Sequence, residues 1–189
     1  MADNRQRLEA ILLAKSFKLG DFTLSSGKKS QYYVDCRTAT LDPEGLFLIS
    51  QMLLDYIEEN KMEIDAVGGL TLGADPIVGG MVALSKSRAK PVQGFIVRKE
   101  AKAHGTGKQV EGNLEYGWNV AIIEDVITTG ASAIKAIEAA KSSGAQIKAV
   151  LAVVDREEGG RGEISKLGIP VHSLFTAAQL KEAAKRKSG

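Results

Sequence analysis

The stretch VAIIEDVITTGAS, residues 120–132, decides the fold of this chain. It begins with an apolar run typical of a buried strand, and from Thr128 onward small and hydroxyl-bearing residues lead into a helical pattern. Such a loop presents backbone N–H groups, hydroxyl donors and the positive end of a helix dipole to one point. We therefore expect residues 120–132 to form a strand, a loop that binds a phosphate monoester and the start of a helix.

Two acids, Glu124 and Asp125, precede this loop, although their charges would repel a phosphate. The conflict disappears if the carboxylates face a ribose diol, because vicinal hydroxyls donate charge-assisted hydrogen bonds to them. The segment therefore predicts a site for a ribose 5-phosphate. The plainer alternative is a strand-to-helix turn in which the acids cap the helix. Neither GxGxxG after a strand nor GxxxxGK followed by Ser or Thr occurs, which excludes two common nucleotide motifs.

Outward from this segment, apolar strands alternate with amphipathic helices, as in an α/β fold. The alternation predicts a central, mostly parallel sheet with right-handed crossovers, flanked by helices. Ligands bind such a sheet beyond the carboxyl ends of its strands. The expected strands are 64–70, 92–98, 119–125, 148–155 and 171–175, and the expected helices are 43–60, 76–87, 131–143 and 177–185.

The first 40 residues do not follow this alternation of strands and helices. A helix over residues 5–17, ended near Gly20, precedes two short strands at 22–24 and 32–35 that flank a turn at residues 25–27. This predicts a small antiparallel hairpin. We expect one domain of residues 1–189, with an N-terminal helix and hood over about 1–40 and a core over about 41–189.

Composition excludes several classes of protein. The formal charge is only +2 and the Lys and Arg residues are dispersed, which gives no indication of a nucleic-acid partner. The single cysteine, Cys36, excludes an internal disulfide or a multi-cysteine metal site. The charged N-terminus lacks the apolar core of a signal peptide, and no run of about eighteen apolar residues occurs. We expect a cytoplasmic protein without a membrane partner.

The apolar strand followed by EDVITTGAS resembles the signature of the type I phosphoribosyltransferases, which bind phosphoribosyl diphosphate. The resemblance implies the fold of that family, with its small N-terminal hood. It also implies that the phosphoribosyl diphosphate site includes Glu124, Asp125, Val126, Ile127, Thr128, Thr129, Gly130, Ala131 and Ser132.

A second segment, RKEAKAHGTGKQVEG at residues 98–112, is polar and rich in cations. A loop of about fourteen residues without structure of its own is usually functional or disordered. Cations that cover a departing diphosphate would stabilise the transition state, whereas the alternative is a solvated charged loop. The resemblance implies that Arg98, Lys99, Lys102 and His104 bind phosphoribosyl diphosphate as a lid, that Lys102 and His104 are catalytic, and that this lid acts in the neighbouring subunit of a homodimer.

Three further segments carry the resemblance over nearly the whole chain: SSGKKSQYYVD at 25–35, GGLTLGADP at 68–76 and VVDREEGG at 153–160. They are similar to family members whose acceptor base is orotate. The resemblance implies that orotate and phosphoribosyl diphosphate give orotidine 5′-monophosphate and diphosphate. It also implies that Mg²⁺ is held through the diphosphate and water, with no protein ligands for the metal.

The resemblance implies that Thr128 and Arg156 bind orotate, since a guanidinium pairs bidentately with a carboxylate. From the residues alone, the alternative role of Arg156 is a surface ion pair with its acidic neighbours. Tyr32 and Tyr33 are expected near the orotate ring, with Lys28 or Lys29 adding charge, although tyrosines pack in cores more often. Some family members have lysine at Ser25 and within the turn Leu72, Gly73, Ala74, so cationic contacts from these positions are absent here.

Two alternatives stay open at this point. The ribose phosphate loop cannot identify the acceptor, so a purine base is possible, although Arg156 and the hood favour an acidic pyrimidine. A regulator that senses phosphoribosyl diphosphate and binds nucleic acid could also keep this fold. The low net charge argues against it.

Overall fold

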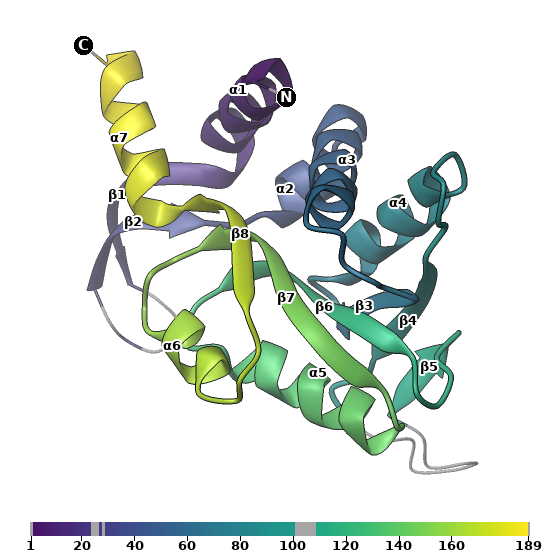
Figure 1. The fold of residues 1–189 in the computed structure, drawn as a ribbon. Helices are drawn as coiled ribbons and strands as arrows, with labels where there is room; N and C mark the ends of the chain where they lie inside the picture. Colours follow the sequence, from purple (N-terminus) through teal and green to yellow (C-terminus); the bar gives the residue numbers. More distant parts are fainter. Residues whose placement is uncertain (1, 24–26, 28, 101–108, 189) are drawn as a thin grey trace.

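The computed structural model describes residues 2–23, 27, 29–100 and 109–188. Within these residues, a six-stranded sheet has the order β5-β4-β3-β6-β7-β8 (Figure 1). All neighbouring strands are parallel except β4 and β5, which are antiparallel. The mostly parallel sheet is therefore confirmed. Its strands are β3 (Ala66–Leu70), β4 (Gln93–Val97), β5 (Val110–Gly112), β6 (Asn119–Ile127), β7 (Gln146–Asp155) and β8 (Val171–Thr176).

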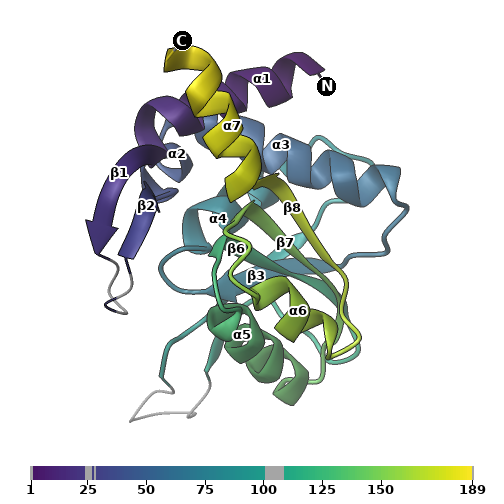
Figure 2. The ribbon, with the colours of Figure 1, turned by 90° about the vertical axis from the view of Figure 1, so that its left-hand side faces the viewer.

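Helices cover both faces of the sheet, as the sequence predicts (Figure 2). Alternate residues of β6 point to opposite faces. Ala121 and Ile123 belong to the core under α3 and α4, whereas Val120 and Ile122 belong to the core under α5 and α6. The helices on the first face are α3 (Pro43–Glu59) and α4 (Asp75–Ser85), and those on the second are α5 (Ala131–Ser142) and α6 (Gly160–Ser165).

The start of α3 shows how local sequence sets these boundaries. The Asp42 side chain accepts a hydrogen bond of 2.8 Å from the Gly45 N–H, and Pro43 occupies the first turn. An acceptor at the N-cap and a proline at the first helical position both favour helix initiation. The helix therefore begins where the sequence predicts.

The direction of the chain reverses between β3 and β6, which are neighbours in the centre of the sheet. From β3 the chain moves outward to β4, then returns to β6 on the other side of β3 and continues to β7 and β8. The crossover helices α4 and α5 consequently lie on opposite faces of the sheet (Figure 1). Such a reversal opens a crevice at the carboxyl ends of the two central strands.

The N-terminal segment forms the hood. Helix α1 (Ala2–Ile11) continues through a π-helical turn, Leu12–Ser16, into β1 (Phe17–Thr23), which pairs antiparallel with β2 (Lys29–Val34). The predicted hairpin is thus confirmed. The predicted helix over residues 5–17 is also present, but the helical segment ends at Ser16 and Gly20 already belongs to β1. The Phe17 ring stacks on that of Tyr32, with centroids 5.5 Å apart, so Phe17 already belongs to the strand pair.

Other elements were not predicted. The loop 98–112 is not wholly without structure, because Val97 pairs with Val110 at the start of β5. The short helices α2 (Arg37–Thr40) and α6, which follow β2 and β7, were not predicted either. The predicted last helix is confirmed as α7 (Ala177–Ser188), which packs beside the hood (Figure 1). None of the helices in the described residues has the length and apolar character needed to cross a bilayer.

Candidate active site

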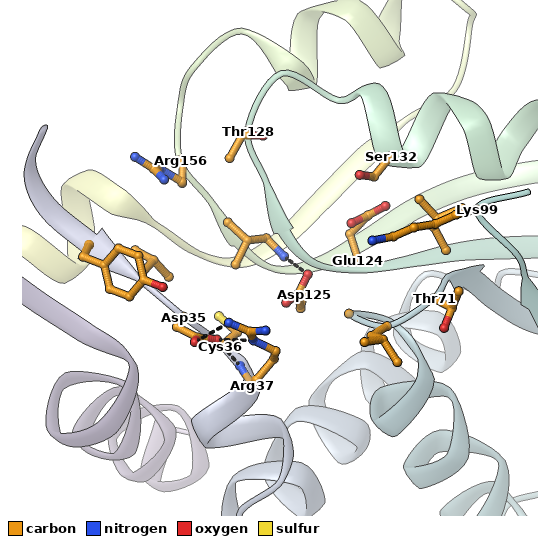
Figure 3. Close-up of a pocket in the computed structure, with 16 residues that line it drawn as sticks. Asp35, Cys36, Arg37, Thr71, Lys99, Glu124, Asp125, Thr128, Ser132 and Arg156 are labelled. Carbon is orange, nitrogen blue, oxygen red and sulfur yellow. Dashed lines mark hydrogen bonds and ion pairs between the residues drawn. The ribbon is translucent and has the colours of Figure 1, made fainter. Parts of the chain in front are cut away.

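A cavity of about 370 Å³ opens beyond the carboxyl ends of β3 and β6, and the hood forms its opposite wall (Figure 3). Ligand pockets in proteins commonly measure roughly 300–1,000 Å³. Both polar and charged side chains reach this one. Its lining residues are Tyr33, Val34, Asp35, Cys36, Arg37, Leu70, Thr71, Leu72, Gly73, Lys99, Glu124, Asp125, Val126, Thr128, Ser132 and Arg156.

The loop between β6 and α5 forms one end of the cavity, where Thr128 and Ser132 face the space. Gly130 is the N-cap of α5 with φ of +82°, a conformation that disfavours side chains. The loop is fixed from behind, since the Gly160 N–H donates to the Thr128 carbonyl at 2.9 Å and the Arg156 N–H to the Ile127 carbonyl at 2.9 Å. The first N–H groups of α5 lack intrahelical acceptors, so this end suits an anion.

Glu124 and Asp125 lie below this loop, near the end of β6. Glu124 is 6% exposed, and its Oε1 has no hydrogen-bond partner within the described residues. Burial, and secondarily the charge of Asp125, raises the pKa of Glu124 to about 8. Burial also raises the pKa of Asp125, although its Oδ1 accepts a hydrogen bond of 2.8 Å from the Val126 N–H. Carboxyl groups in this state are stabilised by hydroxyl donors from a ligand.

Arg156 forms the hood-side end of the cavity. Its side chain is only 8% exposed, and Nε and Nη2 are buried without a hydrogen bond to any described residue. Nη2 lies 2.7 Å from Glu158 Oε1, but the contact lacks hydrogen-bond geometry. The guanidinium lies over the Tyr32 ring, 5.0 Å from its centroid, and the Tyr32 hydroxyl donates to the Arg156 carbonyl at 3.3 Å. A positioned, buried cation with free donors is suited to a planar carboxylate.

The turn after β3 closes the cavity from below. The Thr71–Leu72 peptide is cis, and Thr71 Oγ1 donates to Asp75 Oδ2 at 2.7 Å. Gly73 lies against the carboxylate of Asp125, and the Leu72 side chain is exposed. This turn therefore offers backbone groups and a hydroxyl to a ligand, but no positive charge.

The structure brings many of the predicted site residues together. Those on the cavity wall are Lys99, Glu124, Asp125, Val126, Thr128, Ser132 and Arg156. Five predicted site residues that the structure describes are not on the wall: Arg98, Ile127, Thr129, Gly130 and Ala131. The Ile127 side chain is buried, and Arg98 pairs with Glu111 at 3.7 Å. Lys28, Lys102, His104 and Ser25 lie outside the described residues.

The two tyrosines of the hood have different environments. Tyr32 is buried between Phe17 and Arg156, whereas Tyr33 reaches the cavity. Lys29 bonds Thr23 at 2.9 Å and is not on the cavity wall.

Sequence reasoning missed the wall formed by Asp35, Cys36 and Arg37. Asp35 accepts two hydrogen bonds from the Arg37 guanidinium, Nε to Oδ1 at 2.8 Å and Nη2 to Oδ2 at 2.7 Å. Cys36 is fully buried, and burial raises the pKa of its thiol. The available signal was an acid and a base two residues apart at the carboxyl end of a strand, a pattern that is common on surfaces.

The strand order, the phosphate-type loop at the switch point and the paired acids define a type I phosphoribosyltransferase. An orotate phosphoribosyltransferase of Aquifex aeolicus is 48% identical over 179 residues, which cover 93% of this chain and 97% of the relative. The chain belongs to the orotate phosphoribosyltransferase family.

Solved structures agree with this assignment. The Mycobacterium tuberculosis orotate phosphoribosyltransferase in complex with Fe(III) dicitrate has a TM-score of 0.82 and 36% identity, covering 94% of this chain and 98% of its own. The same enzyme in complex with phosphoribosyl diphosphate has a TM-score of 0.78 and 32% identity, covering 94% of this chain and 99% of its own. A scan against protein-family models found no match.

The chain is accordingly a glycosyltransferase that transfers a pentosyl group. It transfers the ribose 5-phosphate group from phosphoribosyl diphosphate to orotate, giving orotidine 5′-monophosphate and diphosphate in pyrimidine biosynthesis. The family assignment therefore decides against both alternatives, a transferase with a purine acceptor and a regulator that binds nucleic acid.

Proposed function

We propose that this transfer takes place in the cavity between β3, β6 and the hood, with the 5-phosphate on the loop before α5 and the ribose hydroxyls on Glu124 and Asp125. The observation that supports it most strongly is the buried Glu124 carboxyl, whose Oε1 has no partner within the described residues. An isolated buried polar atom costs free energy unless a ligand satisfies it. The loop residues 126–132 supply hydroxyl and backbone donors to the phosphate.

In the proposed reaction, the bond from the ribose C1 to the diphosphate oxygen breaks, and its electron pair leaves with the diphosphate. N1 of orotate gives up its proton to the departing diphosphate or to water and forms the new bond to C1 through an oxocarbenium-like transition state. Glu124 and Asp125 orient the sugar by its hydroxyls, whose hydrogen bonds favour the ionised form of these carboxyls. The resulting negative charge favours the positive charge that develops on the ring. The chain thus contributes positioning and electrostatics, and no covalent intermediate is required.

Orotate is placed at the hood-side end of the cavity. Its carboxylate would accept hydrogen bonds from Nε and Nη2 of Arg156, which make none to the described residues, and would compete with Glu158 for Nη2. Thr128 would contact the base. Tyr33 reaches the same space and could contact the flat ring. This arrangement would bring N1 close to the ribose held on Glu124 and Asp125.

Mg²⁺ would enter with the diphosphate and remain coordinated by its oxygens and by water. The cavity supplies carboxylates from Asp35, Glu124 and Asp125, and among the described residues no group of three His, Cys, Asp or Glu side chains is arranged to hold a metal. This donor set fits an ion bound mainly by its ligand. The ion would supply charge neutralisation to the diphosphate.

The lid forms the remaining part of the proposal. Lys102 would neutralise the leaving diphosphate with help from His104, while Arg98 and Lys99 bind the same group. We propose a homodimer in which each lid acts in the neighbouring subunit. The single domain with its hood over about residues 1–40, and the cytoplasmic location expected from the single cysteine, stay predictions of the sequence.

The loss of orotate absorbance on adding phosphoribosyl diphosphate and Mg²⁺ measures the reaction, and Glu124→Gln tests the placement. We expect kcat/KM for phosphoribosyl diphosphate to fall about 10- to 100-fold, because an amide is a weaker acceptor for the ribose hydroxyls. Glu138→Gln, an exposed position of α5, is the matched control and should leave kcat/KM unchanged. Equal kcat/KM in both variants would exclude Glu124 from the ribose site.

A further inference from the structure

The charges on the cavity wall leave the turn after β3 without a cation of its own. The turn 71–73 carries no positive charge, and three acids, Asp35, Glu124 and Asp125, line the space. Phosphoribosyl diphosphate carries several negative charges, most of them on its diphosphate. The described cations on the wall are Lys99, Arg156 and Arg37. Of these, Arg37 has been given no role so far.

Arg37 presents a free edge of its guanidinium. Asp35 takes the edge formed by Nε and Nη2, with distances of 2.8 and 2.7 Å, and also accepts a 3.0 Å hydrogen bond from the Arg37 N–H. A guanidinium has five N–H donors in a planar fork, so the edge formed by Nη1 and Nη2 still offers donors. Within the described part of the chain, the Arg37 guanidinium has no hydrogen-bond partner other than Asp35. The Arg37 side chain is also 59% exposed, so a ligand in the cavity can reach it.

The neighbours of Arg37 place it beside the turn after β3. Arg37 and Asp125 act on each other electrostatically, and Asp125 in turn lies against Gly73 of that turn. Figure 3 shows Arg37 next to Asp35 and Cys36, on the opposite side of Asp125 from Thr128 and Ser132. Arg37 therefore lies away from the 5-phosphate end and lines the same cavity as the turn that has no cation.

We propose that Arg37 binds the diphosphate group of the substrate and product through this free edge, and that Asp35 is a positioning residue that fixes the guanidinium plane. The inference rests on the proposed placement of phosphoribosyl diphosphate in the cavity. An arginine fork donates two parallel hydrogen bonds to phosphate oxygens, which a lysine cannot reproduce. Asp35 reduces the net charge of the pair, but it also lowers the entropy lost when the guanidinium binds.

Calorimetry with inorganic diphosphate, in the presence of Mg²⁺, tests the contact without the ribose. We expect Arg37→Gln to weaken diphosphate binding about 10-fold or more and to raise the KM for phosphoribosyl diphosphate, while the KM for orotate stays unchanged. Arg186→Gln is the matched control, because Arg186 is similarly exposed and pairs with Glu9 and Glu182 away from the cavity. An unchanged Kd for diphosphate, or an effect on the KM for orotate alone, would overturn the proposal.

Two further variants separate the positioning residue from the binding residue. Arg37→Lys keeps the positive charge but loses the two parallel N–H donors of the guanidinium. Asp35→Asn keeps Arg37 but removes the carboxylate that holds its guanidinium in one orientation. We expect each to weaken diphosphate binding about 3-fold, less than Arg37→Gln, with no matching change in the KM for orotate. If Asp35→Asn weakens orotate and diphosphate equally, Asp35 supports the hood in general and is not the positioning residue.

Competition experiments distinguish this inference from the placement on which it rests. Diphosphate should compete with phosphoribosyl diphosphate for the wild-type protein. Without competition, the placement itself is wrong. If competition occurs but Arg37→Gln binds diphosphate as well as the wild type, the placement stands and only the role of Arg37 is wrong.

Discussion

Gly73 lies against Asp125 so closely that a β-carbon at position 73 would come within 2.5 Å of the Asp125 Oδ1 atom. The obstructing atoms belong to the end of a side chain, so Asp125 would rotate while the backbone stays in place. We expect Gly73→Ala to displace the carboxylate and to raise the KM for phosphoribosyl diphosphate about 10-fold or more. Steady-state kinetics at saturating orotate measures this change.

The control for Gly73→Ala is Gly79→Ala, on the helix that follows the turn. Nothing lies within 4 Å of a β-carbon built at Gly79. Alanine favours a helix over glycine by about 1 kcal/mol, so Gly79→Ala should raise thermal stability slightly and leave the KM unchanged. If both variants have wild-type KM values, the contact between Gly73 and Asp125 has no role in substrate binding.

Glu124 should make the stability of the ligand-free protein depend on pH. Its pKa is raised from 4.5 to about 8 in the folded state, so the folded protein binds this proton more tightly than the unfolded chain. The stabilising contribution is therefore fully present below pH 4.5 and is lost as the pH rises through about 8. Relative to Glu124→Gln, the wild type should lose free energy of unfolding of the order of 3 kcal/mol between pH 5 and pH 8.5.

Urea denaturation of both proteins across this pH range measures the difference in free energy of unfolding between wild type and Glu124→Gln. Groups that titrate alike in both proteins cancel in this difference. Part of the effect arises through Asp125, because each charge disfavours the other when both carboxyls are ionised. A difference between wild type and Glu124→Gln that does not vary with pH would show that Glu124 titrates normally in the folded protein.

Arg156→Lys should impair orotate binding selectively. Lysine keeps the positive charge but cannot supply the two donors, Nε and Nη2, that make no hydrogen bond to any described residue. We expect the KM for orotate to rise about 10- to 100-fold while the KM for phosphoribosyl diphosphate changes little. Because Arg156 also lies over the Tyr32 ring, thermal unfolding should be measured in parallel to detect a displaced hood. A rise in both KM values would contradict the selective role.

The sequence predicted the features that depend on local pattern. Residues 120–132 contain an apolar strand, small loop residues and a helix start in continuous order, and the structure places β6, the loop and α5 there. The alternation of strands and helices was sufficient to predict a mostly parallel sheet. These features are readable because neighbouring residues determine them.

The features that sequence reasoning missed depend on residues far apart in the chain. Strand β5 has only three residues and exists because Val110 pairs with Val97 across a charged loop. Arg37 reaches the cavity because the hood folds back over the carboxyl end of β6, which no local pattern indicates. The buried state of Arg156 likewise depends on Tyr32, which lies 124 residues away in sequence.

The lid is expected to act between subunits, and hybrid dimers can test this. Lys102→Ala should lower kcat by at least about 10-fold, because the departing diphosphate loses a neutralising charge. A Lys102→Ala subunit keeps an intact cavity, whereas an Arg156→Ala subunit keeps an intact lid. If each lid serves its neighbour, a dimer of one subunit of each kind has one complete site.

Random exchange of equal amounts of the two variants places half of the subunits in hybrid dimers, so about a quarter of all sites should become complete. Mixing the two impaired proteins under exchange conditions should therefore restore turnover to about a quarter of the wild-type value. If each lid instead serves its own subunit, the hybrid contains no complete site, and mixing restores nothing. Wild-type protein mixed with Glu138→Gln gives the control, since both subunits stay competent in either arrangement and exchange should leave turnover unchanged.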